Sequence, residues 1–267
     1  MLFKRIYCPK CGQMIDEMVD YCPYCKGENS RTRDFHQKFQ MTFIPFYRQL
    51  MLFILGVLGF FIFNLLFSLL FAQITAQNVL LGTMLINLGS YILFFIFVIA
   101  IIFPYFKCFL KNLKTVRPYI YGMIGAVVVI VGSVLLNLLA YLIYPNAGTG
   151  GNQGTASSIA TAYPIFAIVI LGILGPICEE FAYRVGLFSF LRRVSPVLAY
   201  IGTALIFGLI HFDFTSKDLI TELVYLPNYV FAGIMFSLLY EFGGIGASTT
   251  AHILNNLFSV LLIITGI

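Results

Sequence analysis

The chain has 267 residues, of which 60% are hydrophobic and only 10% charged, and its mean hydropathy is +0.94. This composition excludes an ordinary soluble domain and predicts an all-α protein that crosses a membrane several times. The net charge of +5 does not indicate nucleic-acid binding, because much of the basic excess lies in the polar N-terminal region and in short loops beside apolar segments.

Near the N-terminus, two Cys-x-x-Cys pairs are separated by ten residues. The four cysteines are Cys8, Cys11, Cys22 and Cys25. This spacing is typical of a structural zinc site with four thiolate ligands, and the stretch resembles the short zinc ribbons at the ends of bacterial proteins. Gly12 and Gly27 give conformational freedom just after each pair. Two disulfides are the alternative, and they require an oxidising compartment. We assign residues 1–30 to a zinc ribbon and residues 31–48 to a polar linker.

Seven apolar segments follow and predict about seven transmembrane helices. They cover residues 50–71, 79–103, 119–144, 162–190, 196–211, 223–240 and 245–267. We group them as N-terminal transmembrane helices (residues 49–158) and a C-terminal core (residues 159–267). Residues 145–158 are rich in Gly, Asn, Ser and Thr, so we expect a loop there.

The charged residues between these spans are distributed asymmetrically. Basic stretches precede span one and follow spans two and four, whereas the loops after spans one, three and five are neutral or of mixed charge. This pattern predicts that the N-terminus and the ribbon lie in the cytoplasm and that the protein spans the cell membrane. An odd number of spans then places the C-terminus outside. Reducing conditions in the cytoplasm favour zinc over disulfides.

Span four carries three charged residues in an otherwise apolar helix, which marks a functional site. Glu180 and Arg184 are four residues apart, so they share a helix face and form an internal ion pair. Glu179 lies roughly 100° around the helix and lacks that partner. A carboxylate held in a dry site without a partner is suited to act as a general base. Pro176 is expected to break or kink the helix just before the carboxylates.

Two of the three histidines also lie in apolar spans. Phe207 and His211 end span five, while His252 and Asn256 share one face of span seven. Counting residues from the turns between spans places these side chains with the glutamates, nearer the cytoplasmic side of the membrane.

The three motifs Glu179-Glu180-x-x-x-Arg184, Phe207-x-x-x-His211 and His252-x-x-x-Asn256, in this order on late spans, resemble the CPBP family. This family comprises the CAAX-processing type II proteases and the bacteriocin-processing or self-immunity proteins with the ABI domain. The resemblance covers residues 162–267 and implies an intramembrane endopeptidase with residues 159–267 as its catalytic core. It implies that Glu179 activates a water with help from His211. It also implies that His252 and Asn256 bind the scissile carbonyl and stabilise its oxyanion, with Glu180 and Arg184 as the structural pair.

The residues leave the use of a catalytic metal open. Glu179, His211 and His252 could hold Zn²⁺ with water in an open position, or a glutamate and a histidine could act on water directly. No His-Glu-x-x-His motif occurs, so a zincin-type site is not supported, and we favour a glutamate-based mechanism without metal.

Two other functions compete with hydrolysis. One is a catalytically silent scaffold or bacteriocin-immunity protein that acts by binding; the other is a transporter that relays protons, which the lack of an internal repeat disfavours. The expected partners are membrane lipid, a peptide or membrane-protein substrate, and a cytoplasmic partner for the ribbon. A peptide pheromone, a bacteriocin precursor or a membrane protein fits a bacterial chain better than a prenylated CAAX protein does.

Overall fold

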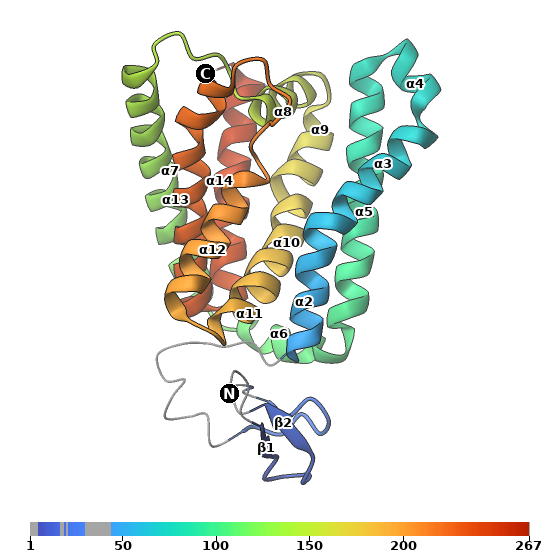
Figure 1. The fold of residues 1–267 in the computed structure, drawn as a ribbon, viewed down its shortest axis with the longest axis vertical. Coiled ribbons are helices and arrows are strands. Elements are labelled where there is room, and N and C mark those ends of the chain that lie inside the picture. Colours follow the sequence, from blue (N-terminus) through green and yellow to red (C-terminus); the bar gives the residue numbers. More distant parts are fainter. Residues whose placement is uncertain (1–4, 17–18, 20, 30–43, 267) are drawn as a thin grey trace.

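The structure is a computed structural model that describes residues 5–16, 19, 21–29 and 44–266. Within these residues, six helices are long and apolar enough to cross a membrane, and a shorter apolar helix accompanies them. A small unit with two strands lies beyond one end of the helical bundle (Figure 1). The predicted class, an all-α membrane protein preceded by a zinc ribbon, is therefore confirmed, with the shorter helix as span five.

The N-terminal ribbon (residues 5–29) contains strand β1 (Arg5–Tyr7) and strand β2 (Met14–Asp16), which pair antiparallel with Ile6 opposite Ile15. Its buried apolar side chains are few: Ile6, Cys8, Ile15, Val19 and Cys22. A core of this size cannot fold a chain alone, so the ribbon depends on its cysteines for stability. Most of the predicted linker, residues 31–43, lies outside the described part of the chain.

The first two spans form a helical hairpin. Span one comprises α2 (Phe46–Ile54), the π-helical η2 (Leu55–Gly59) and α3 (Phe60–Leu70), and a short helix, α4 (Ala72–Gln77), follows it. Span two comprises α5 (Val79–Ile102), the turn η3 (Phe103–Tyr105) and α6 (Phe106–Leu113). Asn78 begins α5, because its side-chain oxygen accepts a hydrogen bond from the Leu81 backbone amide at 3.0 Å.

Span three is α7 (Arg117–Ile143), and it is followed by α8 (Gly151–Ala162). The prediction of a loop over residues 145–158 is therefore wrong for its second half. Composition indicated a loop, but Ala160 near the end of α8 packs against Ala167 and Val260 in a small apolar cluster. This tertiary packing outweighs the weak helix propensity of the segment.

Span four is one continuous helix of 29 residues, Pro164–Arg192, and Pro176 does not break it. It consists of α9 (Pro164–Phe166), η4 (Ala167–Leu174), α10 (Gly175–Glu180), η5 (Phe181–Phe188) and α11 (Ser189–Arg192), of which η4 and η5 are π-helical. The wider π-helical turn ahead of Pro176 lets the helix continue through a residue that has no N–H group.

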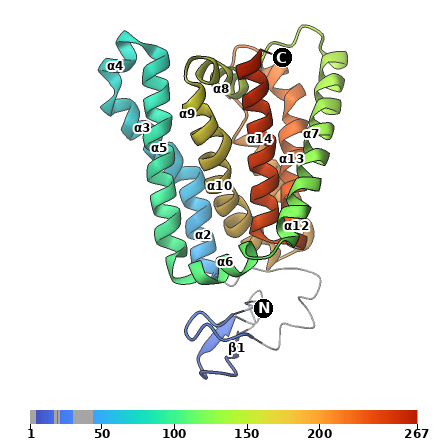
Figure 2. The same ribbon diagram turned by 180° about the vertical axis from the view of Figure 1, so that it is seen from behind.

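The last three helices are α12 (Pro196–Leu209), α13 (Leu219–Gly243) and α14 (Ile245–Thr265). Gly244 joins the last two with a φ of +77°, a conformation that side chains disfavour. Figure 2 shows α14 between span four on one side and α7 and α13 on the other. Close contact with α7 requires Gly122, because a Cβ there would lie 2.6 Å from Thr250.

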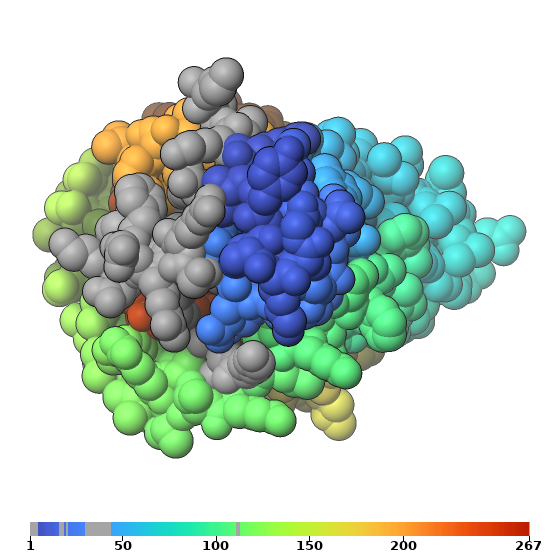
Figure 3. All heavy atoms as spheres, turned by 90° about the horizontal axis from the view of Figure 1, so that it is seen from below, coloured from blue at the N-terminus to red at the C-terminus, as the bar shows by residue number. Residues whose placement is uncertain are grey.

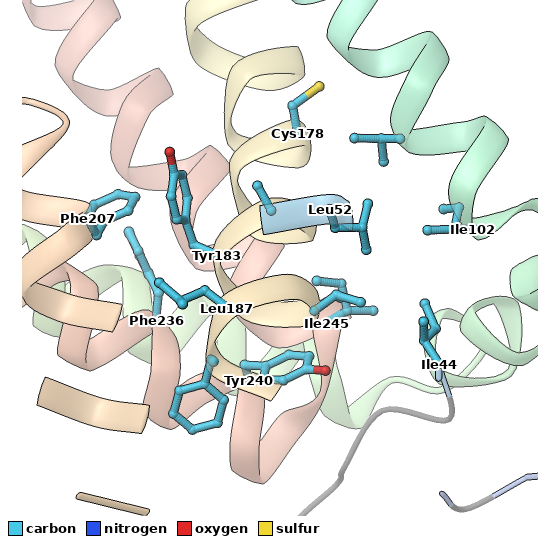
Figure 4. Packing of buried hydrophobic residues seen from close by; sticks show 14 of the residues in the cluster. Ile44, Leu52, Ile102, Cys178, Tyr183, Leu187, Phe207, Phe236, Tyr240 and Ile245 are labelled. Atoms are coloured by element: carbon cyan, nitrogen blue, oxygen red, sulfur yellow. The ribbon is translucent and has the colours of Figure 1, made fainter. Parts of the chain in front are cut away.

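The main core surrounds the ribbon-side half of span four. Phe207 and Phe236 lie to one side of this helix, and Leu52 and Ile102 to the other (Figure 4). Two arginines at the end of the helix are buried rather than solvated, each 8% exposed. Arg192 donates two hydrogen bonds to Glu241, at 3.1 and 3.0 Å, and Arg193 donates to Gln49 at 2.9 Å. These arginines therefore tie span four to α13 and to α2.

The ribbon lies over the ends of α2 and α6 (Figure 3). Its Lys26 ammonium stands 3.7 Å from the centre of the Tyr105 ring, and the Arg48 guanidinium lies 5.5 Å from the same centre. Of these two cation–π contacts, the one from Lys26 joins the ribbon to the membrane-spanning part of the chain.

Candidate metal centre and active site

The four ribbon cysteines converge on one point, with their sulfurs all within 4.8 Å of one another. The Cys8 and Cys25 sulfurs are 3.8 Å apart, and those of Cys11 and Cys22 are 3.6 Å apart. A tetrahedral ion with metal–sulfur bonds of about 2.3 Å has sulfur–sulfur edges of about 3.8 Å. The arrangement therefore fits one four-coordinate ion with no open position.

Two equivalent turns present the sulfurs. In the first, the Cys8 amide donates to Gln13 and the Gly12 amide to Cys8; in the second, the Cys22 amide donates to Gly27 and the Lys26 amide to Cys22, all at 2.8–2.9 Å. The left-handed residues are Gly12 and Lys26, with φ of 70° and 57°. The expectation that Gly27 takes this role is wrong, because the turn places the left-handed residue directly after the second cysteine.

Glu180 and Arg184 form the predicted pair in the centre of the bundle. Both are fully buried, and their nearest charged atoms are 3.4 Å apart. The Arg184 guanidinium also lies 4.8 Å from the Phe207 ring centre and 5.5 Å from that of Phe236. His252 completes the group, since its Nδ1 is 2.9 Å from Glu180 Oε1. The pair is thus held on several sides and is inaccessible to a substrate.

Glu179 points in another direction and retains 14% side-chain exposure. The Tyr91 hydroxyl on α5 donates to its Oε1 at 3.3 Å. Its Oε2 lies 3.8 Å from Nε2 of His252. The imidazole of His252 therefore stands between the two carboxylates, and Glu179 is the one that is open to a cavity.

His211 lies just beyond the end of α12. Its Nδ1 is 2.8 Å from the Phe207 carbonyl oxygen, which can only accept a hydrogen bond, so Nδ1 carries the proton and Nε2 is the basic nitrogen of the neutral ring. The ring stacks on Tyr229, with centres 4.7 Å apart and planes 17° apart. These two contacts fix the orientation of the imidazole.

Asn256 has a different environment from the one predicted. Its side-chain amide donates to the Leu171 carbonyl at 3.1 Å. Two backbone amides could donate to the Leu171 carbonyl within the helix, those of Gly175 and residue 176. The Gly175 amide donates to the Ile170 carbonyl in the π-helical turn, and Pro176 has no N–H group. Asn256 therefore supplies the hydrogen bond that Pro176 removes from span four.

A cavity of about 520 Å³ contains Glu179 and His211 in its wall, together with Tyr91, Tyr183 and Asn152. His252 and Asn256 are not among its lining residues. Glu179 lies near the middle of its 29-residue helix, and the cavity extends from there toward α8, at the end of the bundle away from the ribbon (Figure 1). His252, which contacts Glu179, lies only seven residues after the start of α14, and the position nearer the cytoplasmic side stays a prediction.

A catalytic metal held by Glu179, His211 and His252 requires ligand atoms from all three residues to converge on one point. In the described part of the chain, only the four cysteines form a group of three or more ligand atoms that converge on one point. The three residues as arranged do not fit a shared ion, and we derive no step through one.

Comparison with known proteins now adds to the geometry. Residues 161–258, which include all the residues of this site on the late spans, match the family model of the type II CAAX prenyl endopeptidases, Rce1-like. This match agrees with the resemblance to the CPBP family that the three motifs carry. The chain is 29% identical over 170 residues to an uncharacterized protein of Mycoplasma capricolum, and 28% identical over 160 residues to the membrane-embedded CAAX protease MroQ of Staphylococcus aureus.

The two relatives are matched over 60% and 56% of this chain, and the matches span 48% and 61% of their own lengths. No solved structure matches the chain.

Sequence reasoning missed Tyr91 and Tyr229, which contact Glu179 and His211, the two side chains of the site that face the cavity. Tyr91 is 88 residues away from Glu179 along the chain and lies in an ordinary apolar span. Its only signal is a hydroxyl that requires a partner wherever it is buried.

Proposed function

We propose that the protein is an intramembrane endopeptidase that hydrolyses a peptide bond at mid-depth in the membrane. The observation that carries this proposal is that Glu179 and His211, fixed by Tyr91 and Tyr229, line one cavity inside an apolar bundle. The Rce1-like match over residues 161–258 and the protease name of the Staphylococcus aureus relative support the same reaction.

In the proposed mechanism, Glu179 removes a proton from a water molecule while the water oxygen attacks the scissile carbonyl carbon. His211 orients that water through its basic Nε2 atom. The carbon–nitrogen bond then breaks, and the leaving nitrogen takes the proton from Glu179. A desolvated carboxylate and a fixed imidazole in one dry cavity are suited to this exchange.

The remaining site residues position this pair. His252, held by Glu180 and stacked on Phe236 with ring centres 4.4 Å apart, restrains Glu179 from behind. The Glu180–Arg184 pair balances charge in the bundle centre. Asn256 holds the helix that carries Glu179. Because neither His252 nor Asn256 lines the cavity, we assign them positioning roles in place of the oxyanion role that the family resemblance implied.

We further propose that the ribbon binds a structural zinc ion and lies in the cytoplasm. The sulfur geometry supports a four-thiolate site, and the basic residues near the ribbon end support this orientation. A cytoplasmic ribbon is placed to recruit a partner or a substrate to the bundle.

The test compares membrane-associated and secreted peptides from cells that carry the wild type, Glu179→Gln or the control Glu222→Gln at matched protein levels. Glu222 is a buried carboxylate that accepts from the Gly151 amide at 2.7 Å and does not line the cavity. We expect uncut peptides to accumulate only with Glu179→Gln. Identical peptide profiles with the biological activity retained would favour the binding scaffold.

A further inference from the structure

The lining of the cavity around Glu179 and His211 is unusually poor in charge. No lysine or arginine is among the described residues that line it, and its wall is dominated by aromatic rings. Five of them are Phe60, Phe61, Phe94, Phe212 and Phe214. A substrate carboxylate or phosphate placed here would find no cation to offset its desolvation, and it would face Glu179.

The mouth of the cavity is marked by the two most exposed apolar residues among those that line it. Phe61 on α3 is 69% exposed, and Phe214 in the α12–α13 connection is 70% exposed. On its other side α3 packs against α5, where Phe63 stacks on Phe97 with ring centres 5.5 Å apart. The mouth therefore lies between α3 and the 212–214 segment, in the half of the bundle farther from the ribbon (Figure 1).

From this lining and this position we infer that the substrate is an apolar stretch of a membrane-inserted polypeptide without acidic residues near the cleaved bond, which enters sideways between α3 and the 212–214 segment. This inference rests on the proposed function. The aromatic lining replaces the lipid around the stretch, and Asn64 and Asn152 in the wall offer amide groups to its backbone. The chemistry disfavours recognition of a free C-terminal carboxylate, because no basic side chain is there to pair with it.

The test uses the purified full-length protein in vesicles of phosphatidylcholine and phosphatidylglycerol. The probe is a library of Lys-anchored, Leu/Ala-rich membrane-spanning peptides whose four central positions are randomised, and mass spectrometry identifies the products that Glu179→Gln fails to form. We expect acidic residues to be depleted at least about tenfold at these positions relative to the input, which corresponds to about 1.4 kcal/mol. Acidic residues recovered at their input frequency would overturn the inference while leaving the protease intact.

Two variants distinguish selection of peptides at the cavity mouth from selection by insertion into the vesicle membrane. Phe214→Arg adds the missing cation, so we expect it to reduce the depletion of acidic residues at least about threefold in identical vesicles. The control Leu219→Arg changes an exposed residue at the same end that does not line the cavity, and we expect the wild-type depletion to persist. Equal effects of both variants would overturn the position of the mouth. No Glu179-dependent product from any library member would contradict the proposed proteolysis, and this inference with it.

Discussion

The hydrogen bond from Asn256 to the Leu171 carbonyl can be tested by restoring the donor that Pro176 removes. Asn256→Ala leaves this carbonyl without a partner in a low-dielectric environment, which costs about 1–3 kcal/mol. For a chain of this size, that loss lowers the thermal midpoint by about 2–10 °C. Span four carries Glu179, so we expect peptidase activity to fall together with stability.

Pro176→Ala introduces a backbone N–H five residues after Leu171, in the π-helical register that Gly175 already follows. In the Pro176→Ala protein, Asn256→Ala should lower the stability by at most about half as much as it does in the wild-type protein. The peptidase activity should recover as well. The assay is a thermal series of the purified protein in detergent, followed by size-exclusion chromatography, with cleavage rates measured in parallel.

Asn255→Ala is the matched control, because Asn255 precedes Asn256 on the same helix and donates only to its side chain, at 3.3 Å. Additive effects of Pro176→Ala and Asn256→Ala would refute the reasoning. Restored stability without restored activity would mean that Asn256 acts on the substrate itself.

Three further predictions concern other contacts. Tyr91→Phe removes the hydrogen bond to Glu179, so we expect cleavage to slow by about tenfold at unchanged thermal stability. The control Tyr141→Phe, on the exposed face of α7, should leave the cleavage rate unaltered. An unchanged cleavage rate in Tyr91→Phe would contradict the positioning role of Tyr91. Cys22→Ser should abolish bound zinc, measured by elemental analysis, while the thermal midpoint of the bundle stays within a few degrees; one retained zinc per chain would contradict the four-thiolate site. Lys26 has a left-handed backbone conformation, which costs a residue with a side chain about 1 kcal/mol, and Lys26→Gly removes this cost. The ribbon should therefore release zinc to a chelator more slowly. Faster release would show that the lost contact between Lys26 and Tyr105 matters more.

The sequence was informative about the elements of this fold because the signals are local. Twenty apolar residues predict a span wherever they occur, and four cysteines at ribbon spacing converge whatever follows them. The Glu180–Arg184 pair was also predictable, since four residues on one helix fix the geometry of both side chains. The helix α8 was not, because its composition is that of a loop and only its packing against span four and α14 makes it helical.

The sequence by itself determined the membrane class, the cysteine site, the order of the spans and the charged and histidine residues that meet inside them. Only the tertiary structure decided which of those residues face the cavity. Helix tilt and π-helical turns set the depth and direction of each side chain, and neither leaves a periodic signal in the sequence. Glu179 and His211 therefore line the cavity, while His252 and Asn256, which the motifs alone could not distinguish from them, do not.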